Sequence, residues 1–100
     1  RNSYLSESEQ KVASIIYRSL QDGKNLVISG ERNAQRIRDK ITRSIMQDNL
    51  LRIDYVSVTD AETLVEISGN ISNNILVSTA VFLGKTRLID NFSYSASSNK

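Results

Sequence analysis

The spacing of hydrophobic positions changes about halfway along the 100-residue chain. In the first half, apolar residues recur at three- and four-residue intervals, the period of a helix that buries one face. In the second half, β-branched and aromatic residues gather in short runs that are typical of strands. The pattern predicts an α+β domain, in which two main helices pack on a small three-stranded antiparallel sheet with a C-terminal hairpin.

The first helix is predicted over about residues 7–22. Ser6 and Glu9 have the spacing of a capping box, with Ser6 as the N-cap and Glu9 at the third helical position. The apolar stripe behind them consists of Val12, Ala13, Ile16 and Leu20, with Ile15 beside it. Gly23 is a typical helix stop, so residues 24–30 are expected to form a connection with a small apolar plug.

The second helix is predicted over about residues 31–48. Its apolar stripe consists of Ala34, Ile37, Ile41 and Ile45. Its other faces carry the cations Arg32, Arg36, Arg38, Lys40 and Arg43. A basic helix can be a footprint for nucleic acid, but Glu31 and Asp39 interrupt this one and it has no aromatic residue for base stacking. A solvated helix face is the commoner role of such charges.

Three strands are predicted, at residues 51–58, 75–83 and 86–92. Between the first two strands, residues 59–64 have the pattern of a capped turn that leads into a short helical or irregular piece, and a polar loop precedes the second strand. Residues 93–100 are polar and are expected to form a disordered tail.

Gly84 and Lys85 fit the two-residue loop of a type II′ hairpin, because the first loop residue of that turn needs a positive φ. The turn fixes the register, which places Leu83 opposite Thr86, Val81 opposite Leu88, Thr79 opposite Asp90 and Val77 opposite Phe92. The face expected to pack on the helices holds Ile75, Val77, Val81, Leu83, Leu88 and Phe92.

The tripeptide Gly84-Lys85-Thr86 also matches the end of a phosphate-binding loop. That loop needs a glycine at position 79, where this chain has Thr79, and it must open a helix. Since the residues after Thr86 have a strand pattern, the hairpin is the better interpretation.

The composition restricts the chemistry, because the chain has neither Cys nor His. Thiolate metal sites and catalytic triads are therefore excluded. Among the carboxylates, Asp54 with Asp60, or Asp60 with Glu62, could be paired as acid and base, although Asp60 and Glu62 are better explained as caps of the turn. Asp90, opposite Thr79, is interpreted as a partly buried structural carboxylate that is hydrogen-bonded to Thr79 or to loop amides.

The net charge of +2 gives little electrostatic preference for a partner. No stretch has the length of a transmembrane helix or the pattern of a signal peptide, so a soluble, intracellular protein is expected. The chain starts without Met, and its one Met is Met46, which suggests a fragment of a longer protein or a processed product.

Three stretches, "RNSYLS", "IDYVSVTDAETL" and "GKTRLIDN", follow one another in an order and at a spacing that resemble the C-terminal domain of the pantothenate synthetase (pantoate–β-alanine ligase) family. The resemblance covers about residues 1–92. It implies a C-terminal lid domain at 1–92, followed by the tail at 93–100. Glu7 and Ala61 stand where that family often has Pro, and neither difference undermines the resemblance.

The resemblance implies a role within a larger, AMP-forming ligase. In that family an N-terminal Rossmann-type domain activates pantoate with ATP and Mg²⁺ to give pantoyl adenylate and pyrophosphate. The amine of β-alanine then attacks the adenylate, which releases pantothenate and AMP. This chain would be the lid that closes over the nucleotide and excludes water, and it would be inactive alone, with no catalytic residue, metal ligand or cofactor of its own.

Arg1 is the one site residue that the resemblance implies. It matches the Arg of the family's Ser-Ser-Arg-Asn loop, a counterpart of the KMSKS loop that helps to hold the ATP phosphates, and Asn2 follows it. The implied partners are the chain's own N-terminal domain, the substrates pantoate, β-alanine and ATP, and a second copy in a cytoplasmic homodimer, with no nucleic acid and no membrane. The alternative is an independent small module that binds nucleic acid or an acidic partner through the Arg-rich helix at 31–48.

Overall fold

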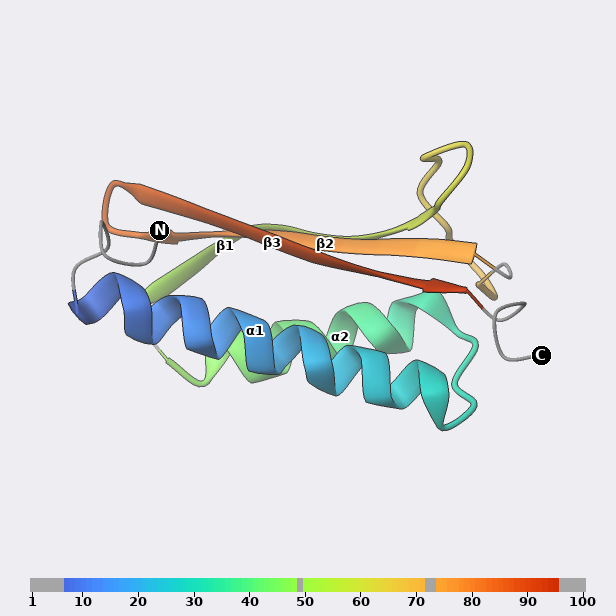
Figure 1. Cartoon of the computed structure of the whole chain (residues 1–100), viewed down its shortest axis with the longest axis horizontal. Coiled ribbons are helices and arrows are strands. Elements are labelled where there is room, and N and C mark those ends of the chain that lie inside the picture. Colours follow the sequence, from blue (N-terminus) through green and yellow to red (C-terminus); the bar gives the residue numbers. More distant parts are fainter. Residues whose placement is uncertain (1–6, 49, 72–73, 96–100) are drawn as a thin grey trace.

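The computed structural model of the chain describes residues 7–48, 50–71 and 74–95. In chain order, the elements are α1 (Glu7–Ile28), α2 (Ala34–Met46), β1 (Leu51–Asp60), β2 (Asn74–Leu83) and β3 (Thr86–Ser95). The strands form one antiparallel sheet in the order β1-β2-β3. Both helices lie on the same face of this sheet (Figure 1), and among the described residues no helix covers the other face. The predicted α+β architecture is confirmed.

α1 is longer than predicted, because Gly23 lies inside the helix and does not end it. The helix continues through Ile28, and Val27, which was expected in a connection, is fully buried. A Cβ added to Gly23 would lie 2.7 Å from two side-chain carbons of Ile41 in α2. Gly23 therefore allows the two helices to approach closely, and the positive φ of +118° occurs at Gly30, just after the helix ends.

α2 begins later than predicted, because Asn33 is its N-cap. The side-chain oxygen of Asn33 accepts hydrogen bonds from the backbone N–H groups of Gln35 (2.9 Å) and Arg36 (3.2 Å), which satisfies two N–H groups that the first turn leaves free. The predicted apolar stripe is confirmed, since all four of its members are fully buried: Ala34, Ile37, Ile41 and Ile45.

The β2–β3 hairpin has the predicted register. Leu83 pairs with Thr86, Val81 with Leu88, Thr79 with Asp90 and Val77 with Phe92. Gly84 has a φ of +59° and Lys85 has no positive φ, the combination of a type II′ turn. β3 continues past the predicted end at Phe92 as far as Ser95. The first residues of the expected tail therefore belong to the sheet, and residues 96–100 lie outside the described ranges.

The core lies between the helices and the inner face of the sheet. All residues predicted for this face belong to it or pack against it: Ile75, Val77 and Val81 are fully buried, and Leu83, Leu88 and Phe92 are partly buried. From α1, the predicted residues Val12, Ile16 and Leu20 join the same cluster. The apolar faces predicted for the helices and for the strands therefore pack together in one core.

β1 contains a β-bulge that the sequence did not predict. Ile53 pairs with Val81 and Tyr55 with Ala80, which leaves Asp54 as an extra residue in β1. The hydrophobic residues of the strand that join or pack against the core are Leu51, Ile53, Val56 and Val58, so the bulge shifts the inward phase from odd to even numbers. Its unpaired residue is carried on the outer side of the sheet, where Asp54 is exposed.

Candidate functional site

The Gly-Lys-Thr tripeptide forms the β2–β3 turn and not a phosphate-binding loop. Lys85 is exposed at the turn, and β3 begins at Thr86, so no helix N-terminus follows to hold a phosphate group. The Thr86 hydroxyl donates a hydrogen bond of 2.8 Å to the carboxylate of Glu9 in the first turns of α1. Thr86 therefore ties the hairpin to the start of the helix.

The candidate acidic residues have structural partners. Asp54 forms an ion pair with Arg87 across the outer face of the sheet, with a shortest distance of 2.9 Å. One carboxylate oxygen of Asp60 accepts hydrogen bonds from the N–H groups of Glu62 (2.8 Å) and Thr63 (3.0 Å). The expected cap at Asp60 is confirmed, and the segment after it is a turn with no helix.

Asp90 was expected to bond to Thr79 or to loop amides, and among the described residues the structure shows neither, although Thr79 and Asp90 are opposite each other. Thr79 is fully buried, and its hydroxyl donates instead to the backbone carbonyl of Tyr55, at 2.7 Å. That carbonyl lies next to the β-bulge, where the regular pairing of β1 is interrupted. The Asp90 carboxylate accepts from the neighbouring N–H of Asn91.

Three of the four arginines in residues 31–48 have partners within the chain: Arg32, Arg36 and Arg38. Arg32 donates to the backbone carbonyls of Val27 (2.9 Å) and Glu31 (3.0 Å). Arg36 lies 3.9 Å from the Glu31 carboxylate. These contacts reduce the free positive charge that a nucleic-acid footprint would need, so the geometry does not favour the module hypothesis.

Arg38 connects α2 to the segment between β1 and β2. Its guanidinium donates to the Glu66 carboxylate at 2.9 and 2.6 Å and also to the backbone carbonyl of Ile67. The same carboxylate accepts from the Ser57 hydroxyl (2.7 Å) and from the N–H of Val58 (2.9 Å). Burial by itself would raise the pKa of Glu66, but these hydrogen bonds and the Arg38 charge hold the pKa below its ordinary value.

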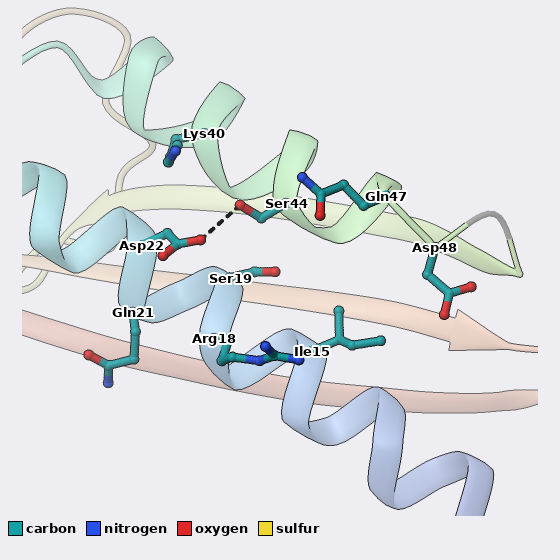
Figure 2. Close-up of a pocket in the computed structure, with 9 residues that line it drawn as sticks. All are labelled: Ile15, Arg18, Ser19, Gln21, Asp22, Lys40, Ser44, Gln47 and Asp48. Atoms are coloured by element: carbon teal, nitrogen blue, oxygen red, sulfur yellow. Dashed lines mark hydrogen bonds between the residues drawn. The ribbon is translucent and has the colours of Figure 1, made fainter.

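A groove of about 760 Å³ lies between α1 and α2. Figure 2 shows Asp22 and Ser44 facing each other across it, joined by a hydrogen bond of 3.1 Å, with the strands behind the helices. Its remaining lining residues are Ile15, Arg18, Ser19, Gln21, Lys40, Gln47 and Asp48. Charges of both signs line the groove. The Ser44 hydroxyl donates to the Asp22 carboxylate, but a carboxylate alone is too weak a base to activate a hydroxyl, so we assign no reaction to the groove.

A second cluster lies on the outer face of the sheet, near the hairpin. In register, Arg52 pairs with Phe82 and Phe82 with Arg87, and the Arg52 guanidinium lies 5.0 Å from the centre of the Phe82 ring. The Arg87 guanidinium lies 5.9 Å from the centre of the Tyr55 ring. Both distances are typical of cation–π contacts. We call this cluster, which consists of Arg52, Asp54, Tyr55, Phe82, Arg87 and Ile89, the outer patch.

The structure does not place the one predicted site residue, since Arg1 lies outside the described residues. Within the described ranges, no group of three carboxylate side chains is close enough to hold a metal ion. Neither of the described helices has a segment long and apolar enough to cross a bilayer.

The sequence prediction missed the groove and the outer patch. Both depend on how elements are juxtaposed: the groove on the contact of α1 with α2, and the patch on the register of β1 with β2. Regular alternation along β1 could have indicated that Arg52 and Tyr55 share the outer face. The bulge at Asp54 interrupts this alternation between the two residues, so the sequence pattern did not place them on one face.

Comparison with known proteins gives a consistent result. The family model described as pantoate-beta-alanine ligase matches residues 1–93. Pantothenate synthetases from Clostridioides difficile strain 630 and Clostridium botulinum strain Langeland are 47% and 46% identical to the chain over 94 residues, which is 94% of this chain and 33% of each relative. The chain thus spans about a third of the length of the curated relatives it matches.

A solved structure agrees with the sequence matches. The crystal structure of pantothenate synthetase from Thermus thermophilus superimposes with a TM-score of 0.75 and 26% identity. The superposition covers 91% of this chain and 32% of that one. The similarity therefore includes the arrangement of the two helices and the sheet.

Proposed function

Because the chain belongs to the pantoate–β-alanine ligase family, we propose that it is the C-terminal lid domain of a pantothenate synthetase. The complete enzyme would condense pantoate and β-alanine with ATP through a pantoyl adenylate, and would yield pantothenate, AMP and pyrophosphate. The observation that carries this proposal is the match over residues 1–93 to a family whose members are about three times as long as the matched segment. The chain alone would be inactive.

The described residues are suited to a supporting role. They contain neither His nor Cys, and the carboxylates Asp54, Asp60 and Glu66 are engaged in an ion pair, a turn cap and a hydrogen-bonded network. Such groups hold a rigid body together, which is what a lid on a hinge requires. The reacting groups would then belong to the remainder of the enzyme.

Arg1 would be the contribution of this chain to nucleotide binding. By the family resemblance, Arg1 matches the Arg of the loop that holds the ATP phosphates. An arginine suits that task because its charge is permanent and its donors are arranged as a planar fork. Among the described residues no three carboxylates lie together as a metal site. Mg²⁺ that accompanies ATP is usually held by the phosphates and one or two carboxylates, and we place those carboxylates in the remainder of the enzyme. When bound, Mg²⁺ neutralises charge on the phosphates.

The proposal extends to the setting of the enzyme. We place the complete protein in the cytoplasm as a homodimer, with its own Rossmann-type domain as the principal partner of this chain. The alternative of an independent module acting through residues 31–48 receives no support from the relatives, which are pantothenate synthetases. Three of the four arginines of that region, Arg32, Arg36 and Arg38, already have intramolecular partners.

A hybrid enzyme tests the proposal. The N-terminal two thirds of the Clostridioides difficile relative would be joined to residues 1–100 of this chain and assayed for ATP-dependent formation of pantothenate. We expect the hybrid to be active and the same protein truncated before Arg1 to be inactive. A well-folded hybrid that forms no pantothenate would contradict the proposal.

Two matched variants of the hybrid test the assigned cation. Arg1→Ala should lower kcat/KM for ATP by about 100-fold, the effect expected when one contact to a developing charge is removed. Lys85→Ala, in which an exposed cation of the hairpin is removed, should leave kcat/KM unchanged. An equal loss in both variants would contradict the role of Arg1.

A further inference from the structure

The outer face of the sheet has two different halves. An antiparallel sheet with one free face normally presents polar side chains there, and the half away from the hairpin mostly does so, with Ser57, Ser78, Asn91 and Ser93 around one part-buried apolar residue, Leu76. The half near the hairpin departs from this pattern. There, Tyr55 is 37% exposed and Ile89 is 56% exposed, beside the two arginines of the outer patch.

The outer patch is held in place before any partner arrives. Ala80 lies in register between Tyr55 and Ile89 and is fully buried although it points outward, so its larger neighbours close over it. The Arg87–Asp54 ion pair and the stacking of the guanidiniums on Phe82 and Tyr55 restrict the rotamers around it. A restricted surface loses little side-chain entropy on binding.

The composition of the outer patch is that of an interface centre. Tyr, Phe and Arg are enriched where protein interfaces contribute most of their binding energy. The groove between α1 and α2, the other candidate surface, is lined by charges of both signs and amides and has Ile15 as its one apolar residue. The outer patch is therefore the stronger candidate for a contact with another folded unit.

The position of the outer patch identifies the occupant. The patch adjoins the β2–β3 turn, and the first turns of α1 reach the same end of the domain, where Glu9 accepts from Thr86. In Figure 1, this end of α1 lies below the turn, and the helices leave the outer face of the sheet open. A folded unit that precedes α1 in the chain would thus lie within reach of the outer patch.

We propose that the outer patch is the surface by which this domain docks on the N-terminal part of its own enzyme. The inference rests on the proposed function, because the relatives supply the other two thirds of the length. The complementary surface would present apolar side chains to Ile89 and Tyr55 and acceptor oxygens to Arg52. The helix side, including the groove, remains in solvent when the lid is closed.

Cysteine labelling of the hybrid enzyme measures the docking directly. Ile89 and Ile28 are the same residue type with nearly equal exposure, 56% and 59%, and lie in β3 on the outer face and at the end of α1 respectively. Since the chain has no Cys, Ile89→Cys and Ile28→Cys each introduce the one thiol of this part of the hybrid. The modified peptide is identified by mass spectrometry after trypsin digestion, with and without ATP and pantoate.

We expect Cys at position 89 to react at least about tenfold more slowly than Cys at position 28 when ATP and pantoate are present, which corresponds to about 1.4 kcal/mol of docking free energy. Equal rates in both conditions, or slower reaction at position 28, would overturn the proposal. Ile89→Lys should also lower pantothenate formation by at least about tenfold, and Ile28→Lys should leave it unchanged.

The two proposals can fail separately. An active hybrid with an unprotected position 89 would overturn the docking surface and keep the lid function. A folded but inactive hybrid with a protected position 89 would keep the docking surface and overturn the function.

Discussion

The hydroxyl of Thr86 and the carboxylate of Glu9 are joined by a hydrogen bond of 2.8 Å, although the residues are 77 positions apart in the chain. The bond connects the turn of the hairpin with the start of α1. It therefore fixes the hairpin turn, beside which the outer patch lies, against the first turns of α1.

Replacing Thr86 by Val should destabilise the chain by about 1 kcal/mol, the usual net value of one hydrogen bond. Val favours strands as much as Thr does, so the loss of stability measures the hydrogen bond and not a difference in strand propensity. Urea unfolding measures it, with Thr86→Ser as the control that keeps the hydroxyl. If the Val variant unfolds at the wild-type midpoint, the bond contributes nothing.

Replacing Thr79 by Val should cost more, about 1–3 kcal/mol, because the backbone carbonyl of Tyr55 loses its hydroxyl donor in a buried place. The two side chains have similar volumes, so no cavity forms. Thermal unfolding of Thr79→Val and Thr79→Ser separates the effects, since Ser keeps the donor and loses a methyl group. A Val variant as stable as the wild type would show that the hydroxyl is unimportant.

Removing the Glu66 charge should make the free energy of unfolding depend less on pH in the acid range. The pKa of Glu66 is lowered in the folded chain, so its stabilisation is present above the unfolded-state pKa of about 4.3 and is lost as pH falls through the folded value. Glu66→Gln should be less stable than the wild type near pH 7 by about 1 kcal/mol or less, because the side chain is half exposed.

The difference between the Glu66→Gln variant and the wild type should shrink steadily below about pH 4.3. Urea midpoints at a neutral pH and at several acid pH values on both sides of this point check it. The control is Glu62→Gln, which changes an exposed carboxylate in the turn after β1, four positions before Glu66. A constant difference across the series would mean that the charge of Glu66 is not what stabilises the network.

Adding a methyl group at Gly23 sets two effects against each other. Ala in a helix interior is favoured over Gly by about 0.8–1 kcal/mol, but the new Cβ would lie 2.7 Å from the buried Ile41 side chain. Overpacking of this kind costs about 1–3 kcal/mol, so Gly23→Ala should be destabilising on balance.

A double variant identifies the cause at Gly23. Ile41→Ala removes both side-chain carbons that lie 2.7 Å from the new Cβ, Cδ1 and Cγ1, so Gly23→Ala should be better tolerated in the Ile41→Ala background than in the wild type. Equilibrium unfolding of the wild type, both single variants and the double variant gives the coupling. Additive effects would exclude the steric contact as the reason for the glycine.

Leu64 has a φ of +62°, the one non-glycine residue with positive φ in the described ranges. Leu64→Gly should stabilise the chain by roughly 0.5–1 kcal/mol. The left-handed conformation costs a residue with a Cβ about 1–2 kcal/mol, and the larger backbone entropy that Gly loses on folding offsets about 0.5–1 kcal/mol of this gain. Leu64 is 62% exposed and its neighbour Val65 is 63% exposed, so Val65→Gly is a matched control. The control should be destabilised, and the same sign of change in both would contradict the argument.

The sequence predicted the parts of the fold that follow from local periodicity. The stripe from Ala34 to Ile45 and the pairing of Val81 with Leu88 depend on spacing and on one turn type, and both are confirmed. It failed at Gly23, because a glycine that ends a helix and a glycine that admits a neighbouring helix have the same local sequence. Only the packing of α1 on α2 distinguishes them.

The candidate sites were harder to predict for the same reason. The partner of Thr79 was assigned from the hairpin register alone, and the actual acceptor is a carbonyl in a third strand whose bulge has no sequence signature. The Arg38–Glu66 contact joins residues that belong to different predicted segments. In both cases the polar partner is selected by tertiary proximity.

The extra residue in β1 has a consequence for how the strand tolerates a change in length. Ile53 and Val56 both face the core, with Asp54 and Tyr55 between them. Deleting Asp54 would leave a regular alternation in which Ile53 and Val56 still point inward and Tyr55 outward, at the cost of the ion pair with Arg87. Deleting Ser57, three positions on, would instead turn Val58 out of the core or reverse the earlier half of the strand. The bulge is therefore the place in β1 where one residue can be lost without reversing either half.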